Sequence, residues 1–192
     1  MIDEEHSLLV SAASLLAIAI EHYGLDHRDI AEAVGIDLSQ PLRPHDRIPL
    51  IKVLNAWTLA VEQTGDSCFG LTAGSLIQAT TLSGLGYSWL ASATLKEGIL
   101  RLVRYQRMIS TDLDIQLEEK AESYCIHFNS WLEQRLSVQA SVDSVLSAVV
   151  QVCRIMIGND FVPESVSFQH PLPSGKDSYQ RFHRFFAAPV NF

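Results

Sequence analysis

The sequence predicts an α+β fold, in which a mainly helical amino-terminal half packs on a small antiparallel β-sheet with a long covering helix. Up to Ser110, apolar residues recur at helical spacing between capping and stop signals. From Thr111 onward they alternate with polar residues over two short segments, which is the period of a strand with one wet face. The 192 residues suffice for one domain with its own core, so we expect residues 1–192 to form a single domain.

Local signals define the helices of the first half. Asp26 can cap a helix that Gly35 closes, and Pro49 suits the first turn of another. Thr94 is followed three residues later by Glu97, which fits a capping box. We therefore expect helices at 8–22, 28–34, 49–63 and 69–78, and one more that begins after Thr94.

The strands follow from alternation and from proline breaks. We expect strands at 112–118, 123–128, 165–169 and 189–192, of which the first two form an antiparallel hairpin. A long helix is expected at 132–157, between the second and third strands. Its stretch 142–157 carries few charges, so we expect it to be buried and to cover one face of the sheet.

Composition and charge argue against several classes of protein. The net charge is -8 and the pI is about 5.3, whereas a DNA-binding surface usually carries a basic patch. The early apolar stretch 8–20 is shorter than the roughly 20 residues of a membrane span, and acidic residues precede it. We therefore expect that this chain does not bind DNA by itself and that it has no membrane partner.

The cysteines and the missing motifs point to a reduced, non-catalytic protein. Cys68, Cys125 and Cys153 are widely spaced, so they predict free buried thiols in a reducing cytoplasm. The sequence contains no G-x-S-x-G, P-loop or H-E-x-x-H motif, and Gly84-Leu85-Gly86 lacks the third glycine of a dinucleotide loop. We expect no enzyme activity, no cofactor and no metal.

Three arginines form a stripe on the helix after Thr94. Arg101, Arg104 and Arg107 could hold an anionic effector. The alternative, which we favour, is a solvated face. In that case the arginines would pair with the acidic residues Asp112, Asp114 or Glu118.

Aromatic and histidine residues near the hairpin are further candidates. Tyr124, His127 and Trp131 could form part of a pocket wall, although core packing is the commoner role of each. Tyr124 and His127 lie on opposite faces of a regular strand, so they cannot both line one pocket. His170 could contact a ligand or a haem, but a surface or capping role is favoured.

The order of several short motifs resembles a known family. These motifs are Thr64-Gly65-Asp66-Ser67-Cys68-Phe69-Gly70-Leu71, Gly84-Leu85-Gly86-Tyr87, Ser92-Ala93-Thr94-Leu95-Lys96-Glu97-Gly98-Ile99, Val103-Arg104-Tyr105, Pro163-Glu164-Ser165-Val166-Ser167-Phe168-Gln169-His170-Pro171 and residues 179–192. Taken in this order, the chain resembles throughout the arabinose-binding-like amino-terminal domain of AraC/XylS transcription regulators, in the branch that includes ornithine- and arginine-responsive regulators.

The resemblance implies a regulatory domain that binds a small effector, dimerises, or does both. It also implies a carboxy-terminal pair of helix-turn-helix units that read DNA. The chain stops inside an apolar segment at Phe192, so we expect it to be cut from a longer protein that carries those units. A ligand-free dimerisation module, built on the long helix, is the alternative function. A small enzyme or a haem sensor is a third, minor one.

The resemblance carries no fixed ligand-binding motif, so the effector site is predicted from residue types alone. We place it at aromatic and basic residues near the hairpin: Arg104, Tyr105, Tyr124 and Trp131.

Overall fold

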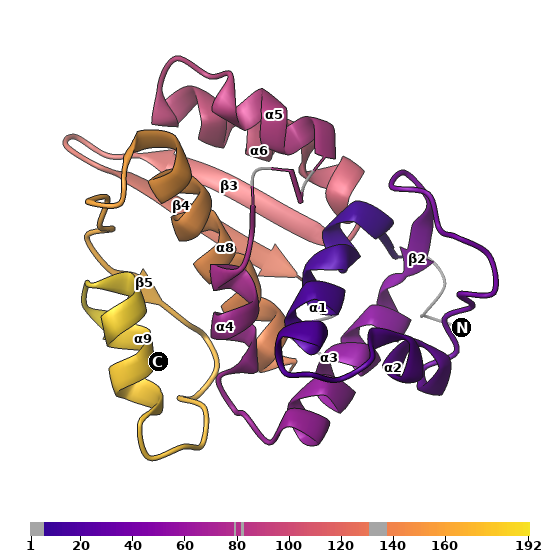
Figure 1. The fold of residues 1–192 in the computed structure, drawn as a ribbon. Helices are drawn as coiled ribbons and strands as arrows, with labels where there is room; N and C mark the ends of the chain where they lie inside the picture. The colour runs from indigo at the N-terminus through magenta and orange to yellow at the C-terminus, as the bar shows by residue number, and fades with distance from the viewer. Residues whose placement is uncertain (1–5, 79, 82, 131–137) are drawn as a thin grey trace.

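The computed structural model describes residues 6–78, 80–81, 83–130 and 138–192 (Figure 1). Its helices are α1 (Val10–His22), α2 (His27–Ala33), α3 (Leu50–Thr64), α4 (Phe69–Ser75), α5 (Ser83–Leu90), α6 (Leu95–Ile109), α8 (Gln139–Ile157) and α9 (Ser178–Phe186). Its strands are β1 (Ser7–Leu9), β2 (Arg47–Pro49), β3 (Leu113–Glu119), β4 (Tyr124–Ser130), β5 (Val166–Ser167) and β6 (Val190–Asn191). The predicted α+β class is confirmed.

The strands do not join into one sheet, which corrects the expected grouping. In the described residues they form three two-stranded sheets. β3 and β4 make the predicted antiparallel hairpin, with Ile115 opposite Phe128, and β1 pairs antiparallel with β2. β5 pairs with β6 in parallel and packs around the apolar side chains of α9. The β3–β4 hairpin and the β5–β6 pair are separate sheets that share no strand edge. The inner face of the hairpin packs in a different core cluster.

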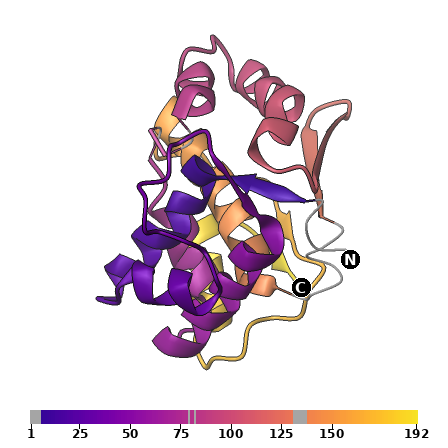
Figure 2. The same cartoon turned by 90° about the vertical axis from the view of Figure 1, so that its right-hand side faces the viewer.

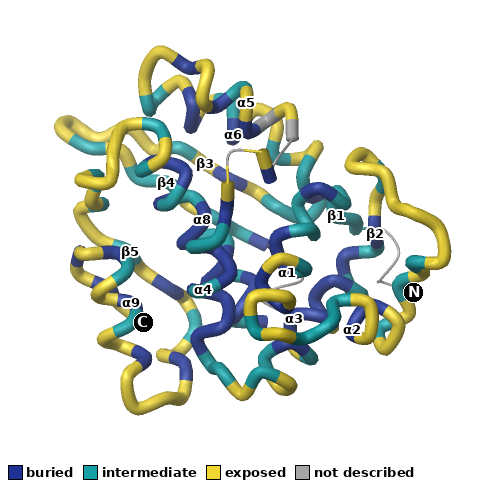
Figure 3. Tube along the Cα trace, in the orientation of Figure 1, coloured by how far each residue is buried: buried dark blue, intermediate teal, exposed yellow. Residues whose placement is uncertain are grey.

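Helix α8 is the centre of the molecule and packs closely on α4 (Figures 1 and 3). The close approach depends on glycine. A Cβ atom at Gly70 would overlap the backbone of Ala140, and one at Gly74 would overlap Ser147 and the backbone of Ser144. Small residues on both helices therefore let the two backbones come together, as they do in other tight helix pairs.

The length and composition of α8 alone would allow it to cross a membrane, with a mean hydropathy of 1.6 over its most apolar window. Half of that window, 50%, is buried inside the protein. The helix also carries the fully buried Asp143 and Ser147 on its length. Packing within this chain therefore accounts for its apolar character, as the sequence predicted.

The core has three parts. One lies among α1, α2, α3 and α4 and contains Trp57 and Phe69. The second lies between α6, the hairpin and α8, and Trp89 and Ile115 are buried in it. The third joins α8 to α9 and the β5–β6 pair through Phe182 and Phe186. Helix α8 thus contributes to the cover of the hairpin, as predicted, but α6 lies directly against β3.

Several local predictions are confirmed, and others need adjustment. The Asp26 side chain accepts a hydrogen bond from the backbone N–H of Arg28, and Thr94 accepts one from that of Glu97 at 3.2 Å. The Glu97 carboxylate accepts from the N–H of Ala93, one residue before the cap. The first helix begins at Val10, because the two residues before it belong to β1. Helix α9 was not predicted.

Candidate functional site

An apolar pocket of ≈ 380 Å³ lies between α1, α2, the start of α3 and the loop that joins α2 to β2. Figure 2 shows the backbone of these segments from a second direction. The volume lies in the usual range for small-molecule sites, about 300–1,000 Å³. The residues that line it are Val10, Ala13, Ser14, Leu16, Ala17, Ile20, His27, Arg28, Ile30, Ala31, Ile36, Leu38, Gln40, Pro41, Leu42, Ile48, Val53 and Ala56.

Two sequence features create the pocket. Ala13 and Ala17 are four residues apart, so they share one face of α1, and their small side chains leave space there. The loop after α2 carries apolar residues where a loop is usually polar, and Leu38 and Leu42 close the opposite wall. Pro41 fixes the backbone between them. The pocket is therefore a gap between a helix face and an apolar loop.

The polar groups that line the pocket are mostly engaged by the protein itself. The Arg28 guanidinium donates to the carboxylate of Asp26 at 2.7 Å, and this bond holds the pKa of Asp26 at about 2. His27 lies 2.7 Å from the carboxylate of Glu21, and Ser14 donates to the carbonyl of Ser11 at 2.6 Å. The lining therefore offers a ligand mainly apolar surface.

A polar network begins at the carboxyl end of α1, one turn beyond the pocket. Tyr23 donates to the carboxylate of Asp66 at 2.5 Å, and Arg181 of α9 donates to the same carboxylate through two nitrogens, at 2.6 and 2.8 Å. Thr72 of α4 joins the group, at 3.1 Å from Arg181. Asp66 thus links α1 to α9.

The charges of this network are stabilised by their mutual contacts. Burial by itself raises the pKa of Asp66, but the hydrogen bonds from Arg181 and Tyr23 outweigh burial and lower it below its usual value. The bond to Asp66 raises the pKa of Arg181. Burial and the bond to Asp66 raise the pKa of Tyr23. The carboxylate is therefore ionised and the phenol protonated at neutral pH.

The predicted effector residues lie away from the pocket. Arg104 and Tyr105 are exposed on α6, where the guanidinium lies 5.5 Å from the centre of the Tyr105 ring. Tyr124 is exposed on β4, with the ammonium of Lys96 over its ring and its hydroxyl 3.2 Å from Glu119. Trp131 lies outside the described residues. The structure does not bring the three described residues together in a cavity.

The arginine stripe makes different contacts from those expected. Arg101 donates to the carbonyl and the hydroxyl of Ser88, at 2.9 and 3.0 Å. Arg104 and Arg107 are exposed, as expected for a solvated face. Within the part of the chain that the structure describes, no ion pair joins the three arginines to Asp112, Asp114 or Glu118.

His170 is neither a surface nor a capping residue, which corrects the favoured interpretation. Its imidazole is 12% exposed, and Nε2 lies 3.0 Å from the carboxylate of Asp143, which is fully buried in α8. Nδ1 lies 2.9 Å from the carbonyl of Pro171, so it donates there. One signal for this contact is visible in the sequence, a single acidic residue within the apolar helix.

The cysteine prediction is partly confirmed. Cys68, Cys125 and Cys153 are all free. Cys68 and Cys153 are buried, and burial raises the pKa of Cys153 to about 12, so this thiol stays protonated. Cys125 is only partly buried on β4, because its side chain lies on the outer face of the hairpin.

Comparison with known proteins identifies the family. Curated proteins provide no match to the chain. Residues 24–192 match the family described as the arabinose-binding domain of AraC transcription regulator, N-term. The match covers α2 to β6, with Asp66, Thr72 and Arg181 of the polar network, while α1 and Tyr23 precede it. This family consists of regulatory ligand-binding domains, not enzymes. The chain belongs to the amino-terminal arabinose-binding domain family of AraC transcription regulators.

Proposed function

We propose that this domain binds a small, largely apolar effector in the pocket between α1, α2 and the loop 36–42. Binding would control a carboxy-terminal helix-turn-helix domain that contacts DNA in the cytoplasm. The observation that carries the proposal is a pocket of ≈ 380 Å³, with a mainly apolar lining, in a chain of a ligand-sensing family. The effector must bind one arrangement of the domain more tightly than another, since equal affinity shifts no equilibrium.

The lining favours one class of effector. Burying a charged group without a partner is costly, and the Arg28 guanidinium and the His27 imidazole at this site already have partners. A molecule with an apolar body and at most one polar or anionic group therefore fits better than a zwitterionic amino acid. This argues against ornithine or arginine as the ligand, although the resemblance pointed to that branch.

The test combines native mass spectrometry with a fluorescent probe. 1-Anilinonaphthalene-8-sulfonate has an apolar body and one anionic group, so it should bind the wild-type pocket with a rise in fluorescence. Ala17→Phe fills the pocket and should weaken binding by at least about tenfold, or about 1.4 kcal/mol. Ala12→Phe is the matched control, because Ala12 lies on the same helix but does not line the pocket.

The same assay separates this pocket from the site predicted near the hairpin. Arg104→Ala and Tyr124→Phe should leave probe binding unchanged, because both residues lie outside the pocket. A loss of binding in these variants, with full binding by Ala17→Phe, would overturn the proposal and favour the hairpin site. A retained small molecule seen by native mass spectrometry should be absent from Ala17→Phe and present in Ala12→Phe.

Dimerisation is the second candidate function. The apolar face of α8 is used within the chain, so that helix is not the best interface. A row on α6 is better placed, since Leu100, Tyr105 and Met108 are exposed by 46%, 37% and 64% on one side of the helix. Sedimentation equilibrium should show a dimer that Met108→Lys weakens and Ile18→Lys, on α1, does not. A monomer at all concentrations would exclude this function for the chain.

A further inference from the structure

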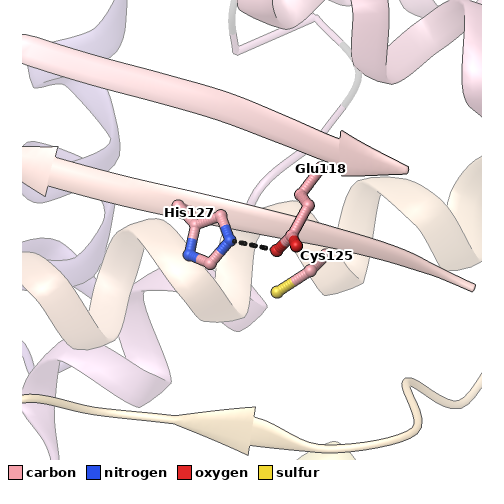
Figure 4. Close-up of side chains that lie close together, drawn as sticks. All are labelled: Glu118, Cys125 and His127. Atoms are coloured by element: carbon pink, nitrogen blue, oxygen red, sulfur yellow. Dashed lines mark hydrogen bonds and ion pairs between the residues drawn. The ribbon is translucent and has the colours of Figure 1, made fainter. Parts of the chain in front are cut away.

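The outer face of the β3–β4 hairpin carries three side chains with metal-binding atoms. Strand pairing places Glu118 directly opposite Cys125, and His127 lies two residues further along β4. All three therefore belong to the same face of the hairpin, because side chains alternate along a strand. Leu117 and Ile126 belong to the other face and pack in the core. Figure 4 shows the three side chains together.

The three ligand atoms are close enough for one ion. Nε2 of His127 lies 3.1 Å from a carboxylate oxygen of Glu118, and the thiol sulfur of Cys125 lies within 4.8 Å of both ligand atoms. Zinc bonds of about 2.0–2.3 Å in a tetrahedron place neighbouring ligand atoms more than 3 Å apart. The three side chains are exposed or partly exposed, so they have room to rotate toward that geometry.

The donor set selects the kind of metal. Thiolate and imidazole ligands suit Zn²⁺ and similar transition metals, whereas Mg²⁺ and Ca²⁺ require oxygen ligands. Glu118 and His127 are exposed and Cys125 is partly exposed, so an ion would be reached from solvent. Three protein ligands would leave the fourth tetrahedral position for water or an exogenous ligand.

Competing contacts at the site are weak. Lys120 lies 3.8 Å from the carboxylate of Glu118, at the limit of an ion pair, and both side chains are 53% exposed. An exposed ion pair of this kind contributes about 0–1 kcal/mol, so a metal ion could displace the lysine. The contact between Glu118 and His127 would be replaced by bonds from both side chains to the ion.

We propose that Glu118, Cys125 and His127 form a surface site for Zn²⁺ or a related thiophilic divalent ion, with one exchangeable ligand position. The site is remote in sequence from the effector pocket and shares no residue with it. It therefore does not depend on the proposed function. Binding would cross-link the two strands of the hairpin, so it should also stabilise the fold.

The test is a titration of the purified 192-residue chain with Co²⁺, followed by competition with Zn²⁺ in a thiol-free reducing buffer. Tetrahedral Co²⁺ with a thiolate ligand gives visible absorption bands and a charge-transfer band in the near ultraviolet. The wild type should show these bands, lose them when Zn²⁺ is added, and unfold at a higher temperature with Zn²⁺ than without it.

Three variants decide the assignment. Cys125→Ser should abolish the charge-transfer band although Cys68 and Cys153 remain, and His127→Ala should weaken binding by at least about 10–100-fold, the cost of losing even an outer-shell partner. Gln116→Ala is the matched control, since Gln116 lies opposite His127 on the same face, and it should bind like the wild type. Circular dichroism checks that each variant folds.

Two results of the Co²⁺ titration would overturn the proposal. A wild-type protein with no Co²⁺ bands at concentrations well above that of the protein would show that the three side chains form only a surface hydrogen-bonded group. A charge-transfer band that persists in Cys125→Ser would place the metal on another thiol and would also overturn the assignment.

Discussion

At the scale of single residues, the buried Asp143 is the most unusual group in the described chain. Burial raises the pKa of its carboxyl group, and the histidine at 3.0 Å opposes that effect. For His170, burial lowers the pKa, but the contacts with Asp143 and with the carbonyl of Pro171 outweigh it and leave the pKa above its usual value. The rings of Phe168 and Phe192 stack on each other, and the imidazole lies beside both of them. The pair therefore fastens the segment after β5 to α8.

These shifts predict a pH dependence of stability. Both raised pKa values mean that the folded protein binds protons more tightly than the unfolded one, so stability falls as pH rises. The contribution of His170 is complete below its unfolded pKa of about 6.5 and is lost as pH rises through the higher folded value. His170→Gln should lower the free energy of unfolding by about 1.5–3 kcal/mol at pH 6, and by less at pH 8.

Denaturant unfolding at the two pH values measures this difference. His45→Gln is the control, because His45 is exposed in the loop before β2. The ion pair would have no energetic role if the cost of His170→Gln were the same at pH 6 and pH 8.

At the scale of elements, the contact between α4 and α8 organises the core. Gly70 and Gly74 lie four residues apart on α4 and face small residues of α8. The contact at Gly70 is with backbone atoms of Ala140, which cannot rotate away as a side chain can. Both helices also contribute to the core cluster that contains the apolar side chains of α9. A change in the spacing of α4 and α8 would therefore change the packing of α9.

Gly70→Ala should therefore destabilise the protein. Overpacking typically costs about 1–3 kcal/mol, occasionally more, and here it outweighs the gain of about 1 kcal/mol that alanine brings to a helix. Gly84→Ala is the matched control, because a Cβ atom at Gly84, in α5, meets no atom within 4 Å. Thermal unfolding should show a lower melting temperature than that of the wild type for Gly70→Ala, but not for Gly84→Ala. Equal melting temperatures would mean that α4 and α8 can separate without cost.

At the scale of the whole molecule, a chain of contacts leads from the pocket to the last helix. Ile20 lines the pocket, and Tyr23 follows it by one turn at the end of α1. Tyr23 binds Asp66, and Asp66 binds Arg181 of α9. These contacts therefore join the wall of the pocket to α9.

This arrangement predicts a coupling that rests on the proposed effector pocket. Binding of the anilinonaphthalene probe should slow amide hydrogen exchange in α1 and also in α9, because ordering α1 fixes the Asp66 network. Arg181→Gln should retain the protection of α1 and lose that of α9. Exchange in the β3–β4 hairpin serves as the internal reference. Protection of α1 without any change in α9 in the wild type would contradict the coupling but not the pocket.

Much of the local structure could be predicted from the sequence alone. Asp26 and Thr94 cap their helices, and alternation in 112–118 and 123–128 predicted the hairpin and its apolar face, with strand ends that the structure shifts by one or two residues. These features depend on hydrogen bonds and periodicity within a few residues, which the sequence displays directly. The order of the short motifs also indicated the family, because these motifs are spread over most of the chain.

The tertiary structure alone decided the sites and the grouping of the strands. The pocket exists because α1 packs beside a loop about 20 residues away, and Asp143 meets His170 only through the fold. Phe182 and Phe186 have helical spacing, but prolines lie on both sides of the segment, and α9 was not predicted. Periodicity shows which face of an element is apolar but not what covers it. Packing between distant segments made that choice, and it formed the pocket beside α1.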